Sequence, residues 1–135
     1  QEYSSPYMKM CMDVVRQEGC YPMAHICGDT SELIGLIADM GTSIFSFDSS
    51  MDLRTIDDEV KNRMTLLGNV DPKKMLLQSA NGAFAESMRC IKRAEKARLI
   101  LGLGDDLVNG TPVENVVAMR RASDRFSAKY HTEHS

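Results

Sequence analysis

The chain has 135 residues, enough for one domain with a buried core. Sixteen basic and 19 acidic residues give a net charge of −3, which argues against nucleic acid and anionic membrane surfaces as partners. No apolar run approaches the roughly 20 residues that a membrane-spanning helix needs, and no signal-peptide pattern opens the chain. The four cysteines follow no zinc-finger or CxxC spacing, so we expect thiols in a reducing, cytoplasmic environment.

Helices and strands alternate along the chain. In the first half, apolar periodicity and turn residues predict a helix over 5–19, a strand over 21–27, a short helix over 32–41, a strand over 43–48 and a helix over 55–64. The second half predicts a strand over 65–71, a helix from 72, a helix over 82–97, a strand over 98–104 and a helix over 111–126. Four strands that alternate with helices imply parallel pairing through right-handed crossovers, and hence an α/β fold.

Capping patterns mark where three of these helices begin. Residues 29–32 (DTSE) have the pattern of an N-cap with a glutamate three residues on. Residues 71–72 (DP) suit the cap and the first position of a helix. Residues 111–114 (TPVE) have the pattern of a capping box with proline at the first helical position. We expect the polar residues 127–135 after the last helix to form a flexible tail.

Polar residues follow each predicted strand. In parallel α/β folds, the carboxyl ends of the strands form the functional face. The polar residues therefore gather at one rim, where a functional site is expected: Asp29, Asp48, Asn69, Asp71, Asp105 and Asp106.

His25 and Cys27 lie two residues apart near the end of the first predicted strand. Residues i and i+2 of a strand point to the same face, so both side chains can reach one site. Imidazole and thiolate are good zinc ligands. On the residues alone, however, a strand with one histidine and one cysteine is more often an ordinary part of the core, so both interpretations stay open at this point.

The motifs HICGDT, FSFDSSMDL, LLGNVDP, LILGLGDDL and GTPVENVVAMRRA occur in an order that resembles the uroporphyrinogen decarboxylase superfamily, over roughly residues 5–126. Within it, the resemblance is closest to the corrinoid-dependent methyltransferases of the methylcobamide:coenzyme M type. Members are (β/α)8 barrels, which take roughly 250 residues. The resemblance therefore implies that residues 1–126 are the C-terminal half of a barrel, with strands five to eight. Because such a half-barrel has two open sheet edges, we expect a piece of a longer enzyme or a homodimer paired through those edges.

The resemblance also implies a metal site. In the methyltransferase branch, the HxC motif and a cysteine after the last strand bind zinc, which activates the acceptor thiol; His25 and Cys27 match the HxC motif. The expected second cysteine is replaced by Asp105, with Asp106 beside it. The implied ligands are His25, Cys27 and Asp105, or Asp106 after a shift of one residue. The harder carboxylate donor could move the metal preference from zinc toward iron, cobalt or manganese.

Two further residues at strand ends complete the predicted site. Asp48 lies where the methyltransferases carry an acidic residue near the metal, which implies a fourth ligand or a partner of the ligands. Asn69 in GNVDP lies at a strand end facing the site, where it hydrogen-bonds a substrate or shapes the turn. We take Asp48 and Asn69 as candidate catalytic residues.

The motifs and the resemblance leave three alternative functions to compare. The first is an enzyme that moves a methyl group between a corrinoid protein and a metal-activated thiol; the corrinoid comes with the partner, because the chain has no cobalamin-binding signature. The second is a uroporphyrinogen decarboxylase-like enzyme, which needs no metal and uses an aspartate and arginines mainly in the other half of the barrel. The third is a non-catalytic half-barrel. The HIC motif and the acidic strand ends favour the methyltransferase.

Overall fold

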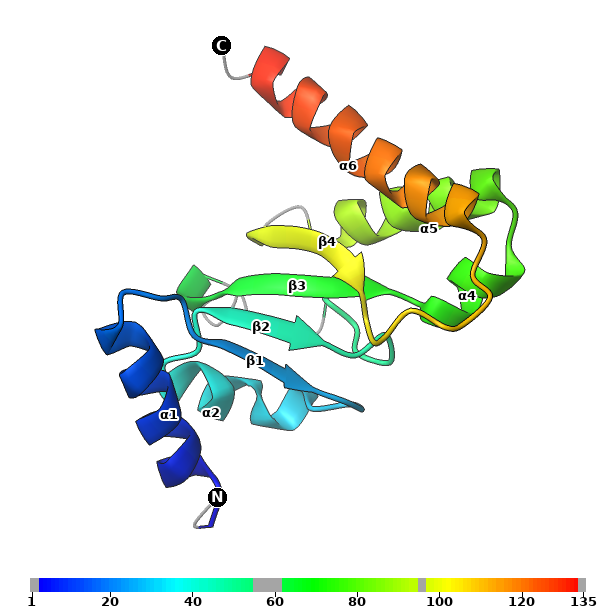
Figure 1. The fold of residues 1–135 in the computed structure, drawn as a ribbon. Helices are drawn as coiled ribbons and strands as arrows, with labels where there is room; N and C mark the ends of the chain where they lie inside the picture. Colours follow the sequence, from blue (N-terminus) through cyan, green and yellow to red (C-terminus); the bar gives the residue numbers. More distant parts are fainter. Residues whose placement is uncertain (1–2, 55–61, 95–96, 134–135) are drawn as a thin grey trace.

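The computed structural model describes residues 3–54, 62–94 and 97–133. Within them, four parallel strands form one sheet in the order of the sequence (Figure 1): β1 (Met23–Ile26), β2 (Ile44–Phe47), β3 (Thr65–Val70) and β4 (Leu99–Leu103). Each strand pairs with the next one along the chain, as strands do within an arc of a (β/α)8 barrel. The predicted α/β half-barrel of parallel strands is confirmed.

Helices separate the strands, close to the predicted positions. They are α1 (Ser5–Gln17), the 3-10 turn η1 (Ser31–Leu33) with α2 (Ile34–Asp39), α4 (Pro72–Leu77), α5 (Ala80–Arg93) and α6 (Val113–Glu133). Of the helix predicted over 55–64, only residues 62–64 belong to the described part of the chain. None of the described helices is long and apolar enough to cross a membrane.

The end of the last helix differs from the prediction. The helix was expected to end at Phe126 before a flexible tail over 127–135, but α6 continues to Glu133 and extends away from the sheet (Figure 1). Residues 127–133 contain no glycine or proline. Polar composition alone does not stop a helix, because helix ends need a residue that breaks or caps the backbone pattern.

Of the predicted helix caps, the one at Asp71 forms and the capping box over 29–32 does not. The carboxylate of Asp71 accepts a hydrogen bond from the backbone N–H of Lys73 and caps α4, as expected. The capping box over 29–32 is not formed, because Thr30 is the N-cap of η1 and makes no side-chain cap bond. Asp29 instead accepts hydrogen bonds from the N–H and the hydroxyl of Ser31, which closes an Asx turn before η1.

The two faces of the sheet have different surroundings. The outer face packs against the helices and supplies most of the core. Its buried side chains are each no more than 5% exposed: Ala24, Phe45, Phe47, Leu66 and Val70. Alternate residues point to the opposite, inner face. By the strand register, the residues that share this inner face are Met23, His25, Ile44, Ser46, Thr65, Leu67, Asn69 and Ile100.

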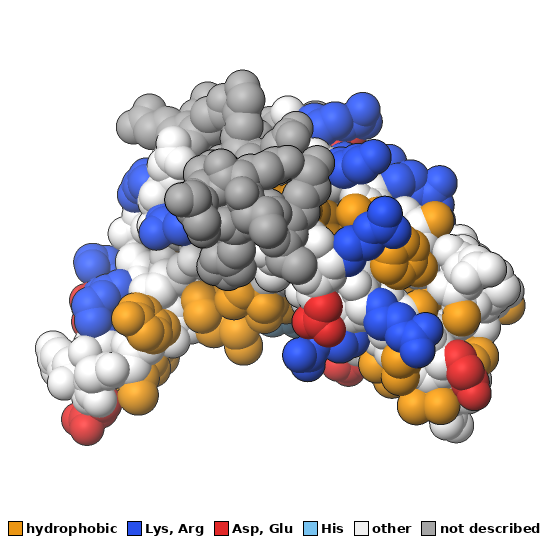
Figure 2. Space-filling model, turned by 90° about the horizontal axis from the view of Figure 1, so that it is seen from above, with side chains coloured by type: hydrophobic (Ala, Val, Ile, Leu, Met, Phe, Trp, Pro, Cys, Tyr) orange, Lys and Arg blue, Asp and Glu red, His pale blue; other side chains and the backbone are white. Residues whose placement is uncertain are grey.

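The inner face is partly open to solvent. Met23 is 56% exposed and Ile100 is 44% exposed, although both lie within strands. At the amino ends of the strands a cavity of about 330 Å³ is lined by Tyr21, Ser43, Ile44, Arg63, Thr65, Arg98 and Ile100. Figure 2 shows the molecule with a hollow side, at whose base hydrophobic side chains are exposed. In the described part of the chain the inner face is therefore concave, apolar in part, and partly open to solvent.

Candidate metal centre

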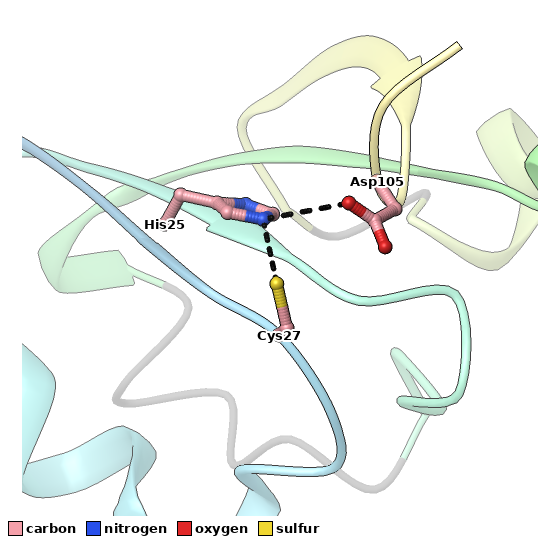
Figure 3. A group of neighbouring side chains, drawn as sticks. All are labelled: His25, Cys27 and Asp105. Carbon is pink, nitrogen blue, oxygen red and sulfur yellow. Dashed lines mark hydrogen bonds and ion pairs between the residues drawn. The ribbon is translucent and has the colours of Figure 1, made fainter. Parts of the chain in front are cut away.

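Three side chains with metal-ligating atoms meet at the carboxyl end of the sheet (Figure 3). The sulfur of Cys27 lies 3.4 Å from Nε2 of His25, and the same nitrogen lies 4.0 Å from Oδ1 of Asp105. All three ligand atoms lie within 4.8 Å of one another, and all three residues are exposed. The structure thus brings together the three residues that the sequence predicted as ligands.

Asp105 reaches this cluster from the far edge of the sheet. His25 lies on β1 and Asp105 follows β4, so three strand spacings of about 4.8 Å would separate them by roughly 14 Å on a flat sheet. The chain turns back at Gly104, where a Cβ atom would lie only 2.3 Å from the backbone nitrogen of Ser49. This close approach requires glycine and directs the following residue toward β1.

The two neighbouring aspartates differ in their distance from the cluster. Asp105, not Asp106, groups with His25 and Cys27 among the described residues. The backbone N–H of Asp106 donates to Oδ1 of Asp105 at 2.8 Å, which helps to fix the orientation of the Asp105 carboxylate.

The separation between the ligand atoms of His25 and Cys27 fits a tetrahedral metal ion, and the ligand atom of Asp105 lies within 4.8 Å of both. Nitrogen, oxygen and sulfur ligands about 2.0–2.3 Å from zinc lie roughly 3.3–3.6 Å from one another at tetrahedral angles. The separation of 3.4 Å between Cys27 and His25 lies in this interval. The separation of 4.0 Å between His25 and Asp105 needs a small rotation of the exposed carboxylate. The donor set is one that zinc accepts.

Ser46 was missed by the reasoning from sequence. Its Oγ lies 2.9 Å from Nδ1 of His25, on the side of the ring away from Cys27. The alternation of the second strand places Ser46 on the same face as Asp48, and this was a usable signal. Which residue of the first strand would lie beside it depends on the strand register, which the sequence pattern leaves open.

Asp48 lies next to the cluster but is not part of it. Its two carboxylate oxygens accept backbone hydrogen bonds from Gly28 at 2.8 Å and from Ser50 at 2.7 Å. These bonds, the one from Gly28 above all, lower the pKa of Asp48. Gly28 has φ +83°, a conformation that favours glycine. Asp48 therefore ties the turn after Cys27 to the loop after β2.

Asn69 uses both hydrogens of its amide to hold the same loop. They donate to the carbonyl oxygens of Asp48 at 3.1 Å and of Met51 at 2.9 Å. The backbone N–H of Asn69 points to the sulfur of Cys90, 3.3 Å away. These contacts correspond to the turn-shaping role that the sequence left open, and a role of Asn69 with substrate stays a prediction.

Comparisons with known proteins relate the sequence of this chain to a family. The sequence model of the uroporphyrinogen decarboxylase (URO-D) family matches residues 1–126. The methylcobamide:CoM methyltransferase MtbA of Methanosarcina acetivorans is 28% identical over 126 residues, which are 93% of this chain and 36% of the relative. The chloroplastic uroporphyrinogen decarboxylase 2 of Arabidopsis thaliana is 29% identical over 117 residues, 86% of this chain and 29% of the relative.

A solved structure gives the same picture of the fold. A methyltransferase from Methanosarcina mazei superposes with a TM-score of 0.76 at 23% identity, over 93% of this chain and 36% of that chain. The chain thus spans about a third of the length of the relatives that it matches. Since the family match extends over residues 1–126, the chain belongs to the uroporphyrinogen decarboxylase family.

Proposed function

We propose that this chain is part of a methyltransferase that moves a methyl group between a corrinoid protein and a metal-activated thiol. The cluster of His25, Cys27 and Asp105, with ligand atoms within 4.8 Å of one another, is the observation that carries the proposal. Relatives named methylcobamide:CoM methyltransferase support it. In this proposal the cluster binds zinc or another divalent transition metal, and the thiol is the methyl acceptor.

The three side chains suit an open catalytic metal site. Zinc supplies, when bound, the positive charge that keeps an acceptor thiol in its thiolate form at neutral pH. Catalytic zinc sites have three protein ligands and one open position. His25 offers Nε2, Cys27 its sulfur after loss of a proton, and Asp105 a carboxylate oxygen. Because all three residues are exposed, an acceptor can approach from the solvent side.

The methyl donor is proposed to come with a partner protein. The sequence contains no cobalamin-binding signature of its own, so the corrinoid would be presented to the rim formed by the strand ends. The corrinoid would supply the methyl group and keep the electron pair of the broken bond, while His25, Cys27 and Asp105 would hold the metal that activates the acceptor thiol.

The open edges of the sheet are part of the proposal. β1 and β4 are the two edge strands of the described sheet, and the inner face between them exposes Met23 and Ile100. We propose that these edges are covered in the functional protein. The cover is either the remaining strands of a longer polypeptide, whose relatives are about three times as long, or a second copy of this chain.

Metal content tests the proposal most simply. The chain would be purified without chelators and analysed by mass spectrometry as wild type, as Cys27→Ala and as Cys11→Ala, since Cys11 is an exposed cysteine on α1 outside the cluster. We expect near-stoichiometric metal in the wild type and in Cys11→Ala, and its loss in Cys27→Ala. A folded wild-type chain that takes up no metal when zinc is supplied would contradict the proposal and favour the decarboxylase or non-catalytic alternatives.

A further inference from the structure

Ser46 lies beside the candidate ligand His25 on the neighbouring strand. The parallel register pairs the two residues directly, so both side chains belong to the inner face. Oγ of Ser46 lies 2.9 Å from Nδ1 of His25. Ser46 is only 8% exposed, so the hydroxyl end of this part-buried hydrogen bond is shielded from water.

The two nitrogens of the His25 ring have different neighbours. Nδ1 meets Ser46, whereas Nε2 lies 3.4 Å from the sulfur of Cys27 and 4.0 Å from Oδ1 of Asp105. A histidine that ligates a metal through one nitrogen almost always donates the N–H of the other to an acceptor, which fixes the tautomer and the ring orientation. The Ser46 hydroxyl is an acceptor at the required position.

We propose that Ser46 is a positioning residue of the metal site. Its Oγ accepts a hydrogen bond from Nδ1–H of His25, which leaves the lone pair of Nε2 directed toward Cys27 and Asp105. This inference rests on the proposed function, because it concerns the same metal. It assigns the role to the hydroxyl group itself rather than to the small size of the side chain.

The test compares zinc affinities of four forms of the whole chain: wild type, Ser46→Ala, Ser46→Thr and Ser43→Ala. Affinity is measured by competition with a chromophoric chelator. Ser46→Ala is expected to bind zinc about 10- to 100-fold more weakly. Ser46→Thr retains the hydroxyl and should stay close to wild type. Ser43 lies just before β2, at the opposite end of the sheet, and Ser43→Ala should leave the affinity unchanged.

A spectroscopic measurement separates positioning from a general effect on stability. In the zinc-loaded wild type, the Nδ1–H proton of His25 should exchange slowly with water in NMR spectra, because Ser46 holds it. In Ser46→Ala the exchange should become faster. The chain has only three histidines, so a His25→Gln variant identifies the signal.

Each outcome has a distinct meaning. Equal zinc affinity and equal proton exchange in Ser46→Ala and wild type would overturn the role of Ser46 and leave the proposed metal site intact. Weak binding by Ser46→Ala that Ser46→Thr does not restore would also overturn it, because the hydroxyl is then not the cause. A wild-type chain that binds no zinc would overturn the proposed function and this inference together.

Discussion

The outer and inner faces of the sheet differ in the kind of side chain they present and in how far those side chains are exposed to solvent. On the outer face, Phe45 and Phe47 are completely buried against the helices. On the inner face, Met23 is 56% exposed and the polar side chains of His25 and Ser46 form the edge of the candidate metal centre. We therefore expect stability and the candidate chemistry to depend on separate sets of residues, although both sets alternate along the same strands.

The largest effect is expected from a change on the outer face. Phe47→Ala should lower the free energy of unfolding by about 3–5 kcal/mol, because it removes a fully buried ring and leaves a cavity. The matched change on the inner face, Met23→Ala, should cost less than about 1 kcal/mol, since its side chain is already half exposed. Urea denaturation followed by circular dichroism measures both. Similar losses for the two variants would break the comparison.

A smaller effect on stability, with a clear effect on the site, is expected at Gly104. A methyl group there would lie against the backbone of Ser49, so Gly104→Ala should displace the turn that carries Asp105. We expect a loss of about 1–3 kcal/mol in stability together with weaker zinc binding. Unchanged zinc affinity in this variant, with the chain still folded, would show that the turn does not position Asp105.

The smallest effect concerns pH. In the folded chain the backbone N–H of Gly28 lowers the pKa of Asp48 from its ordinary value of 3.8. The ionised carboxylate is therefore favoured by folding, so its contribution to stability is present above that ordinary value and is lost as the pH falls below it. Asp48→Asn should be less stable than wild type at pH 7, and the difference should shrink as the pH falls below 3.8. A constant difference in urea midpoint across this range would contradict the assignment.

The sequence was informative about elements and less so about the contacts between them. The apolar run before Gly28 predicted β1, and the Asp71–Pro72 pair predicted the start of α4, because both signals are local. The end of α6 was predicted too early, since polarity was taken for a stop signal. Local patterns therefore located the elements to within a few residues but not every boundary.

The candidate site shows the same limit. His25, Cys27 and Asp105 were named from a motif and found together, whereas Ser46 was missed because its contact depends on strand register. Asp48 was expected at or beside the metal; it lies next to the cluster, where its oxygens accept hydrogen bonds from the backbone N–H groups of Gly28 and Ser50, and a role toward the metal stays a prediction. The bond from Ser50 is a local Asx turn, whereas the bond from Gly28 joins two loops 20 residues apart in the sequence, and no local pattern specifies it.

The most direct measurement of the central claim is anomalous diffraction at the zinc edge from crystals of this chain grown with zinc. We expect one strong peak about 2.0–2.3 Å from Nε2 of His25, the sulfur of Cys27 and a carboxylate oxygen of Asp105. A peak bound by other residues, or none at this cluster despite zinc in the crystals, would contradict the account.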